Sequence, residues 1–158
     1  MPLDDASAPR ARLLGSALVA AQFALMGLLA WIGLPAFAQG RAPWGAWVLA
    51  AAGVALGLWA VTANRPGNFN IRPTPRAGGH LVRSGPYRWV RHPMYTSVLA
   101  AGAACAWAAS APAGALALLA LAAVLTAKAG FEERWMLAAH PGYADYRQRT
   151  RRFLPGLF

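Results

Sequence analysis

Charged residues are scarce in this chain, and acidic residues are the scarcest. Of its 158 residues, 13% are charged and 58% are hydrophobic, and only 5 are aspartate or glutamate. A soluble domain usually carries about 25% charged residues, so this composition argues against a soluble enzyme. A single cysteine, Cys105, excludes a disulfide framework within the chain. It lies in an apolar stretch, where it fits the role of a small packing residue.

Charge is absent altogether from three long stretches, which cover residues 13–40, 42–64 and 93–127. The first two each match the roughly 20 apolar residues that a helix needs to cross the hydrocarbon core. The third is too long for one crossing and contains Pro112, which suits the start of a new helix. We split it into spans 94–109 and 112–130, joined by a tight turn. The sequence therefore predicts an all-α integral membrane protein with about four transmembrane helices.

The basic residues are distributed unevenly around these four predicted spans. Of the 15 Lys and Arg residues, all except Arg41 fall on the side that holds both termini and the segment between the second and third spans. Cytoplasmic segments carry such an excess of positive charge. We therefore expect a multi-pass protein of a bacterial-type inner (plasma) membrane, with both termini in the cytoplasm. Trp31, Trp44 and Trp47 fit an aromatic belt at the outer boundary.

The net charge of +10 has a second conceivable meaning, which is nucleic-acid binding. However, the arginines lie beside membrane segments, where an anionic leaflet attracts each by about 1 kcal/mol, and they show no nucleic-acid-binding motif. We therefore expect no nucleic-acid partner. The small residues at 36–38 resemble a signal-peptidase site, although the preceding apolar stretch exceeds the roughly 7–15 residues of a signal sequence. Processing of this segment stays open, as does the oligomeric state.

The chain divides into three parts. Residues 1–12 are expected to be a disordered lead. Residues 13–63 are expected to form two scaffold helices, because neither span contains an ionisable group; Arg41 lies in the turn between them. Residues 64–158 are expected to form the catalytic module, which includes a helical hairpin rich in alanine and glycine. Small residues let helix backbones approach closely in lipid, so the hairpin should be tight and antiparallel.

The polar residues of the third part gather in two blocks. The first is "SGPYRWVRHPMY" at 84–95, and the second starts with "FEERWML" at 131–137 and ends with "YADYRQRTRRFLP" at 143–155. The blocks lie at the two open ends of one predicted hairpin, so they should be neighbours on the cytoplasmic side. Charges at a membrane boundary are costly unless they are paired or functional. The two blocks therefore mark the expected site.

These motifs together resemble a known family. The segments "GPYRWVRHPMYTS", "FEERWML", "YADYR" and "RRFLP" are similar to those of membrane methyltransferases related to isoprenylcysteine carboxyl methyltransferase and phospholipid methyltransferase, over residues 68–155. The resemblance implies methyltransferase activity of the EC 2.1.1 type with S-adenosylmethionine as cofactor. It also implies a cofactor site on the cytoplasmic side and a lipophilic or amphipathic acceptor that enters from the bilayer. Ser97 departs from the family pattern, which often has glycine there.

The resemblance and the residue types together suggest a role for each polar side chain. Arg91 and His92 can donate to the cofactor's carboxylate, and the two glutamates can accept from its amino group and ribose. Helical geometry turns adjacent side chains about 100° apart, so we favour Glu133 in the pocket and Glu132 paired with Lys128 or an arginine. The expected cofactor-binding residues are Gly85, Tyr87, Arg91, His92, Pro93, Tyr95, Glu132, Glu133, Tyr143 and Tyr146. The expected catalytic residues are Tyr95, Glu133 and Arg152.

Several alternatives stay open at this point. Four arginines, namely Arg88, Arg147, Arg149 and Arg151, fit contacts with a lipid leaflet instead of a role in the site. His80 and His140 are isolated from other ligand-type residues, so we expect no metal site. The chain could instead be an NADPH-dependent reductase related to sterol reductases, or a non-catalytic lipid-binding membrane module. The sequence also leaves open whether the acceptor atom is oxygen, nitrogen or sulfur.

Overall fold

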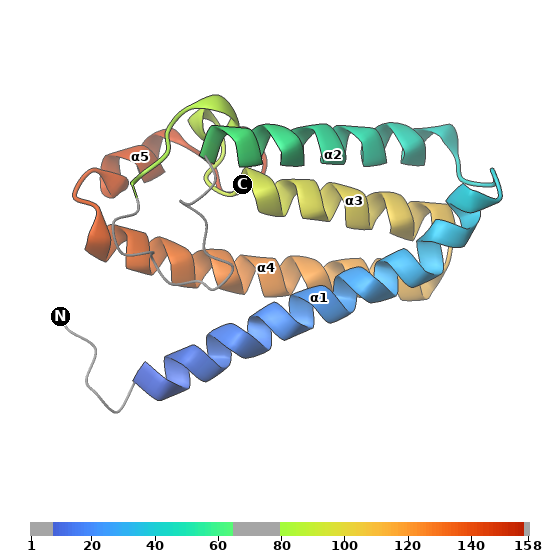
Figure 1. Cartoon of the computed structure of the whole chain (residues 1–158), viewed down its shortest axis with the longest axis horizontal. Helices are drawn as coiled ribbons and strands as arrows, with labels where there is room; N and C mark the ends of the chain where they lie inside the picture. Colours follow the sequence, from blue (N-terminus) through green and yellow to red (C-terminus); the bar gives the residue numbers. More distant parts are fainter. Residues whose placement is uncertain (1–7, 65–79, 157–158) are drawn as a thin grey trace.

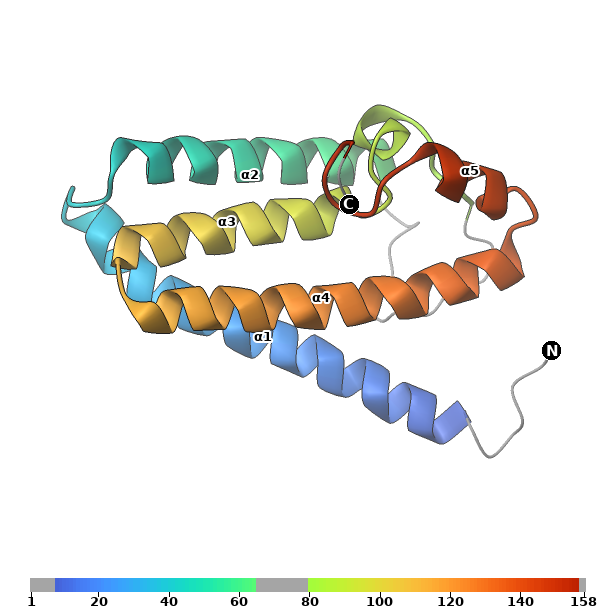
Figure 2. The ribbon, with the colours of Figure 1, turned by 180° about the vertical axis from the view of Figure 1, so that it is seen from behind.

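The structure is an elongated helical bundle with short elements gathered at one end (Figures 1 and 2). This computed structural model describes residues 8–64 and 80–156, with side chains from residue 13 onward. In chain order the elements are α1 (Ala8–Ala38), α2 (Trp44–Asn64), the short 3-10 helix η1 (Gly85–Arg88), α3 (Pro93–Ala109), α4 (Pro112–Ala139) and α5 (Tyr143–Arg149). The all-α class predicted from the sequence is confirmed.

The first helix is longer than the sequence suggested. α1 begins at Ala8, so residues 8–12 are helical, whereas we had assigned them to a disordered lead; residues 1–7 lie outside the described residues. The physical reason is local. Pro9 lies in the first turn, where its missing N–H is not needed, and the alanines, arginines and leucines that follow are strong helix formers.

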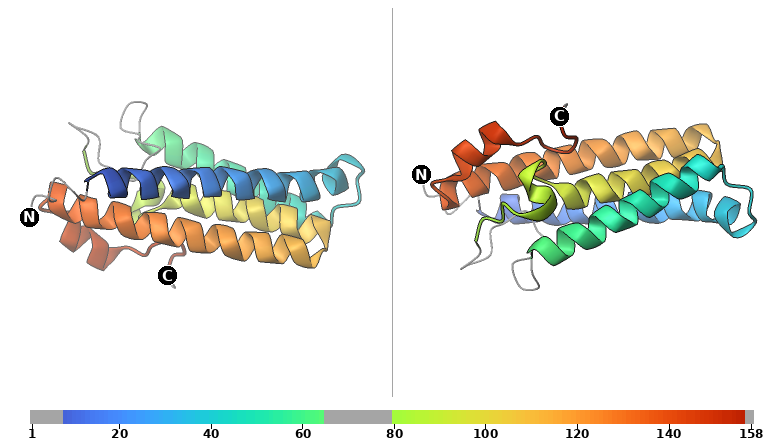
Figure 3. Two further views of the ribbon diagram at one scale, coloured as in Figure 1. Left: turned by 90° about the horizontal axis from the view of Figure 1, so that it is seen from below. Right: turned by 90° about the horizontal axis from the view of Figure 1, so that it is seen from above.

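Three of the helices are long and apolar enough to cross a membrane, namely α1 from Leu13 to Ala38, α2, and α4. α3 has 17 residues, which is the lower end of the usual range of about 17–25 for a span. It runs alongside the three longer helices (Figure 3). The chain is therefore an all-α membrane protein in which α3 is the shortest of the four predicted spans.

α3 and α4 form the predicted antiparallel hairpin. Ser110 adopts a left-handed conformation with φ 50°, and its Oγ donates to the carbonyl of Trp107 over 3.1 Å. Pro112 then opens α4, where a proline costs no backbone hydrogen bond. The two helices approach closely: a Cβ added at Gly114 would lie 3.1 Å from the Cα of Ala106.

Small residues also join α3 to α2, a contact that the sequence did not reveal. A Cβ added at Gly53 would lie 3.1 Å from the carbonyl oxygen of Ser97, and one added at Gly57 would lie 3.1 Å from its Oγ. The same hydroxyl donates to the carbonyl of Met94 over 2.8 Å. The serine that departs from the family pattern therefore belongs to the contact between α2 and α3.

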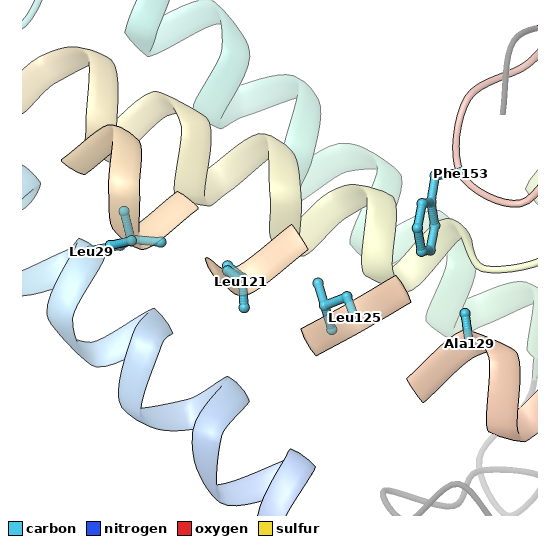
Figure 4. Close-up of a cluster of buried hydrophobic side chains, with 6 residues drawn as sticks. Leu29, Leu121, Leu125, Ala129 and Phe153 are labelled. Carbon is cyan, nitrogen blue, oxygen red and sulfur yellow. The ribbon is translucent and has the colours of Figure 1, made fainter. Parts of the chain in front are cut away.

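A line of buried apolar side chains runs along α4 toward the C-terminal segment (Figure 4). Leu121, Leu125 and Ala129 of α4 are completely buried, and Leu29 of α1 packs with them. Phe153, which follows α5, belongs to the same cluster. Burial of Phe153 therefore draws the end of the chain back onto α4, beside the two glutamates.

We predict that Gly33→Ala destabilises the bundle, whereas Gly27→Ala on the same helix does not. A Cβ at Gly33 would lie 2.6 Å from the Cα of Cys105, and one at Gly27 would meet nothing within 4 Å. Overpacking of this kind costs about 1–3 kcal/mol, while Gly→Ala in an open helical position gains up to about 1 kcal/mol. Thermal unfolding in detergent, followed by far-ultraviolet circular dichroism, measures both. Equal melting temperatures for the two variants would contradict the close approach of α1 and α3.

Candidate cofactor-binding site

The two polar blocks meet at one end of the bundle, because the C-terminal segment pairs with the segment before α3. Val90 and Arg151 form an isolated parallel bridge. The backbone N–H of Arg91 donates to the carbonyl of Arg151 over 2.8 Å, and that of His92 donates to the carbonyl of Arg152 over 3.1 Å. The neighbourhood predicted from the hairpin is thus present, and backbone hydrogen bonds fix its register.

η1 places the first block against α2. Gly85 has φ 58°, a conformation that strongly favours glycine, and a Cβ there would lie 2.9 Å from the Cβ of Ala63. Pro86 and Tyr87 follow and are buried, and Pro93 opens α3 and is buried as well. These residues therefore set the path of the backbone. A contact between them and a cofactor stays a prediction.

Glu133 lies at the centre of the site. Its side chain is 3% exposed and accepts a hydrogen bond from Nε of Arg91 over 2.9 Å. Arg152 binds both of its oxygens, each over 3.1 Å. Nε of Arg147 lies farther away, 3.7 Å from Oε2 of Glu133. Bidentate guanidinium–carboxylate pairs are among the strong hydrogen bonds of proteins, so this buried carboxylate is well compensated.

Arg91 connects this cluster to the backbone around the end of α5. One of its terminal nitrogens donates to the carbonyl of Arg147 over 3.1 Å and also to the carbonyl of Thr150. Carbonyls at a helix C-terminus lack partners within the helix, and a cation satisfies them and matches the helix dipole. Arg91 therefore ties α5 to the glutamate on α4. Whether it also contacts a cofactor stays a prediction.

His92 joins the two adjacent glutamates. Its Nε2 lies 3.3 Å from Oε1 of Glu133, and its Nδ1 lies 3.4 Å from Oε2 of Glu132. The two glutamate side chains leave α4 in different directions. One imidazole ring reaches both of them through its two nitrogens. A ring that donates to carboxylates from both nitrogens is an imidazolium. Glu132, 23% exposed, also accepts from the hydroxyl of Tyr95.

The charge state of His92 follows from its surroundings. Burial lowers the pKa of His92, but hydrogen bonds and charges from Glu132 and Glu133 outweigh it, so the net pKa lies above the ordinary value. The ring stacks on Tyr95 with centroids 5.4 Å apart and planes 4° from parallel. The two glutamates thus favour the positively charged form of His92.

Three of the four tyrosines expected to bind the cofactor, namely Tyr87, Tyr143 and Tyr146, are buried. The hydroxyl of Tyr146 donates to the carbonyl of Tyr87 over 2.8 Å, and its ring meets that of Tyr143 edge-on at 5.8 Å. Burial raises the pKa of Tyr87 to about 12, with a further contribution from Glu132, and burial also raises the pKa of Tyr143 and of Tyr146. They therefore remain protonated donors. Their contact with the cofactor stays a prediction.

The remaining arginines of the second block lie on the surface. Arg147, Arg149 and Arg151 are exposed, as is Arg88 in η1. Arg147 also faces Glu133, as described above. Arg83 has no role among the sequence-based predictions. It donates to the carbonyl of Gly142 over 2.8 Å and so attaches the turn before α5 to the first block.

Two further residues escaped the sequence reasoning. Gln22, on a helix that we had read as scaffold alone, accepts a hydrogen bond from Nζ of Lys128 over 2.7 Å. Both side chains are buried. The only available signal was a glutamine in the middle of the long uncharged stretch 13–40, whose other glutamine, Gln39, lies near its end. The contacts described here for Glu132 are with Tyr95 and His92, and its expected pairing with Lys128 or an arginine stays a prediction.

Comparison with protein families agrees with this arrangement. The model of the phospholipid methyltransferase family matches residues 42–141. The chain belongs to the phospholipid methyltransferase family. Family membership indicates methyltransferase activity, and the matched region contains α2, α3, α4 and the first polar block. It ends before α5, so Arg147 and Arg152 join the site through the fold. Searches of curated proteins and of solved structures gave no match.

We predict that Glu133→Gln strongly destabilises this family member. The substitution removes the charge that compensates Arg91 and Arg152, and loss of one partner from a buried ion pair typically costs about 3–5 kcal/mol. The exposed Asp145→Asn is the matched control, because exposed ion pairs contribute only about 0–1 kcal/mol. Chemical unfolding in detergent micelles, monitored by tryptophan fluorescence, compares the two. A Glu133→Gln variant as stable as the control would show that the cluster does not hold the C-terminal segment.

We also predict that stability falls as pH rises above about 6.5, the unperturbed pKa of histidine. Because the folded-state pKa of His92 is raised, its contribution is complete below the unfolded-state pKa and is lost as pH rises through the folded-state pKa. Melting temperatures measured across this range should show the decline. His92→Gln should flatten it, and His140→Gln, at the end of α4, should not. Persistence of the decline in His92→Gln would assign it to another group.

Proposed function

We propose that this protein is an S-adenosylmethionine-dependent methyltransferase that acts on a lipophilic or amphipathic small molecule in the membrane. Family membership supports methyl transfer. The observation that carries the proposal is the cluster in which His92 links Glu132 and Glu133 at one end of an apolar bundle. A charged site that adjoins membrane-spanning helices suits a charged cofactor and a lipophilic acceptor.

The donor set fits S-adenosylmethionine, which supplies an electrophilic methyl group and carries a carboxylate, an ammonium and two ribose hydroxyls. Arg152 and Glu132, with side chains 21% and 23% exposed, are more accessible than Arg91 and Glu133. We assign Arg152 and His92 to the carboxylate, and Glu132 to the amino group or the ribose. Tyr87, Tyr143 and Tyr146 are our candidates for the wall beside adenine.

The more deeply buried pair has a different part. Arg91 and Glu133 are 9% and 3% exposed. They contact each other, and Arg91 also contacts the backbone near α5. Glu133 also contacts His92, Arg147 and Arg152. We assign this buried pair to holding Arg152 and His92 in place before the cofactor arrives. Such preorganisation matters because a group fixed in advance does not have to reorganise during the reaction.

Tyr95 and Glu132 are the candidates for handling the acceptor. The tyrosine hydroxyl donates to Glu132, so the pair offers a carboxylate that can take up a proton. An amine acceptor must lose a proton for net methylation, and a carboxylate at hydrogen-bonding distance can receive it. A carboxylate acceptor needs no base, and then the pair serves only to orient it.

Ligand binding and product analysis test the proposal together. We expect S-adenosylhomocysteine, the demethylated cofactor, to raise the melting temperature of the purified protein, because a ligand at 100 times its Kd stabilises by about 2.7 kcal/mol. With radiolabelled cofactor, label should enter products extracted from fractionated membrane lipids. Stabilisation by NADPH instead would favour a reductase, and no response to either ligand would favour a non-catalytic module. Label confined to water-soluble products would contradict a lipophilic acceptor.

The cluster is proposed to face the cytoplasm, because all basic residues except Arg41 belong to its side of the chain. Single cysteines introduced as Arg41→Cys and Arg149→Cys, in a Cys105→Ala background, test this orientation. Both positions are exposed. Arg41 belongs to the turn between α1 and α2, which lies at the opposite end of the bundle from α5, the helix that contains Arg149 (Figure 1). An impermeant thiol reagent applied to intact cells should modify the first and spare the second. The reverse pattern would invert the orientation.

A further inference from the structure

Lys128 is a charged residue within a membrane-spanning helix. It lies on α4, one turn before Glu132, and is only 2% exposed. Ionisable residues inside membrane segments are costly, so they are rare and usually serve a function. Neither the family match nor the site described above gives this residue a role. The question is what a buried amine does there.

A residue from a distant helix fixes the position of this amine. Nζ of Lys128 donates to Oε1 of Gln22 over 2.7 Å. The amide nitrogen of Gln22 in turn faces the sulfur of Met26 at 3.8 Å. α1 therefore contributes a buried polar group whose oxygen points at Lys128.

The same amine lies over the ring of Tyr95, with 5.1 Å between Nζ and the ring centroid. A cation in this position is attracted to the face of an aromatic ring, and more strongly where water is excluded. His92 stacks on the ring, and Phe153 meets it edge-on at 6.4 Å. The ring of Tyr95 is thus confined by three neighbours. Its hydroxyl is left to bind Glu132.

We infer that Lys128, held by Gln22, is a positioning residue, which fixes the ring of Tyr95 so that its hydroxyl holds Glu132 in the orientation that the methyl-transfer site requires. This inference rests on the proposed function, because it concerns the same Tyr95–Glu132 pair. It adds Lys128 and Gln22 to the residues that support the site, and Gln22 belongs to α1. Lys128 itself does not touch the reacting atoms.

A purely structural role of Lys128 and Gln22 predicts a different result. If the Gln22–Lys128 hydrogen bond served only to join α1 to α4, apolar side chains of similar size would serve as well, since replacing both partners of a buried polar pair is often nearly neutral. A positioning role requires the cation itself, because an apolar side chain lacks the charge that is attracted to the face of the Tyr95 ring. The double variant Lys128→Met with Gln22→Leu separates the two.

The first measurement is steady-state kinetics in detergent or nanodiscs. We expect the double variant to keep the melting temperature and the affinity for S-adenosylhomocysteine, while its kcat falls about tenfold or more, since small misplacements in a site can cost up to about 100-fold. Lys128→Arg retains the cation and the donors and should restore most of the rate. Gln39→Leu, which breaks a polar contact with Arg41 at the far end of the bundle, is the control and should leave kcat unchanged.

The second measurement does not depend on turnover. Nitrogen NMR of labelled histidines follows the titration of His92, which faces Glu132, Glu133 and Tyr95. If the double variant releases Glu132, His92 loses the constrained position of one carboxylate partner, and its pKa should fall toward the ordinary value. Lys128→Arg should leave this titration close to that of the unmodified protein.

The outcomes are distinct. A double variant with unchanged kcat and unchanged His92 titration would overturn the inference. A wild-type protein that neither binds S-adenosylhomocysteine nor transfers methyl groups would overturn the proposed function instead, and the His92 titration would still decide whether Lys128 positions Glu132. Should the double variant not fold, Gln22→Met is measured by the same two readouts, because it removes one acceptor of the Lys128 amine and leaves the amine itself in place.

Discussion

Compensation of the buried carboxylate of Glu133 is the constraint on which the polar end of the bundle depends. Glu133 lies on a helix that continues directly from a membrane-spanning segment, and it is almost completely buried. A charge in that position must be compensated or it would destabilise the fold by several kcal/mol. Arg91 supplies compensation from the segment before α3, and Arg152 supplies it from the segment after α5. The end of the chain therefore has to return to the bundle.

That return has further consequences for the site. Once Arg152 reaches Glu133, the backbone near Arg151 pairs with the backbone near Val90, and Phe153 enters the apolar cluster on α4. α5 is then fixed from both sides, because Arg91 binds carbonyls at its C-terminus and Tyr146 binds the backbone of η1. Electrostatic pairing and apolar burial thus favour the same arrangement, which is what a single well-defined site requires.

The apolar part of the bundle supports the site through close backbone contact. α3 carries small residues that face α1, α2 and α4, at Cys105, Ser97 and Ala106 respectively. Close packing of small residues is the main source of helix association in lipid, where burial of apolar surface contributes little. It fixes the start of α3, and hence His92 and Tyr95, relative to the glutamates on α4. The family match covers this framework but ends before α5, so the fold adds the C-terminal arginines to it.

The sequence alone determined the helical class, the hairpin with its turn before Pro112, and the meeting of the two polar blocks. These follow from general constraints: a membrane requires helices, and a hairpin brings its two open ends together. The sequence did not determine which glutamate is central, that Arg91 binds the end of α5, that Ser97 faces α2, or that Gln22 reaches Lys128. Each of these depends on how a helix is rotated about its axis. Helices that are apolar on all sides have no polar face from which that rotation can be read, so only the packing of their small residues in three dimensions decides which side chains meet.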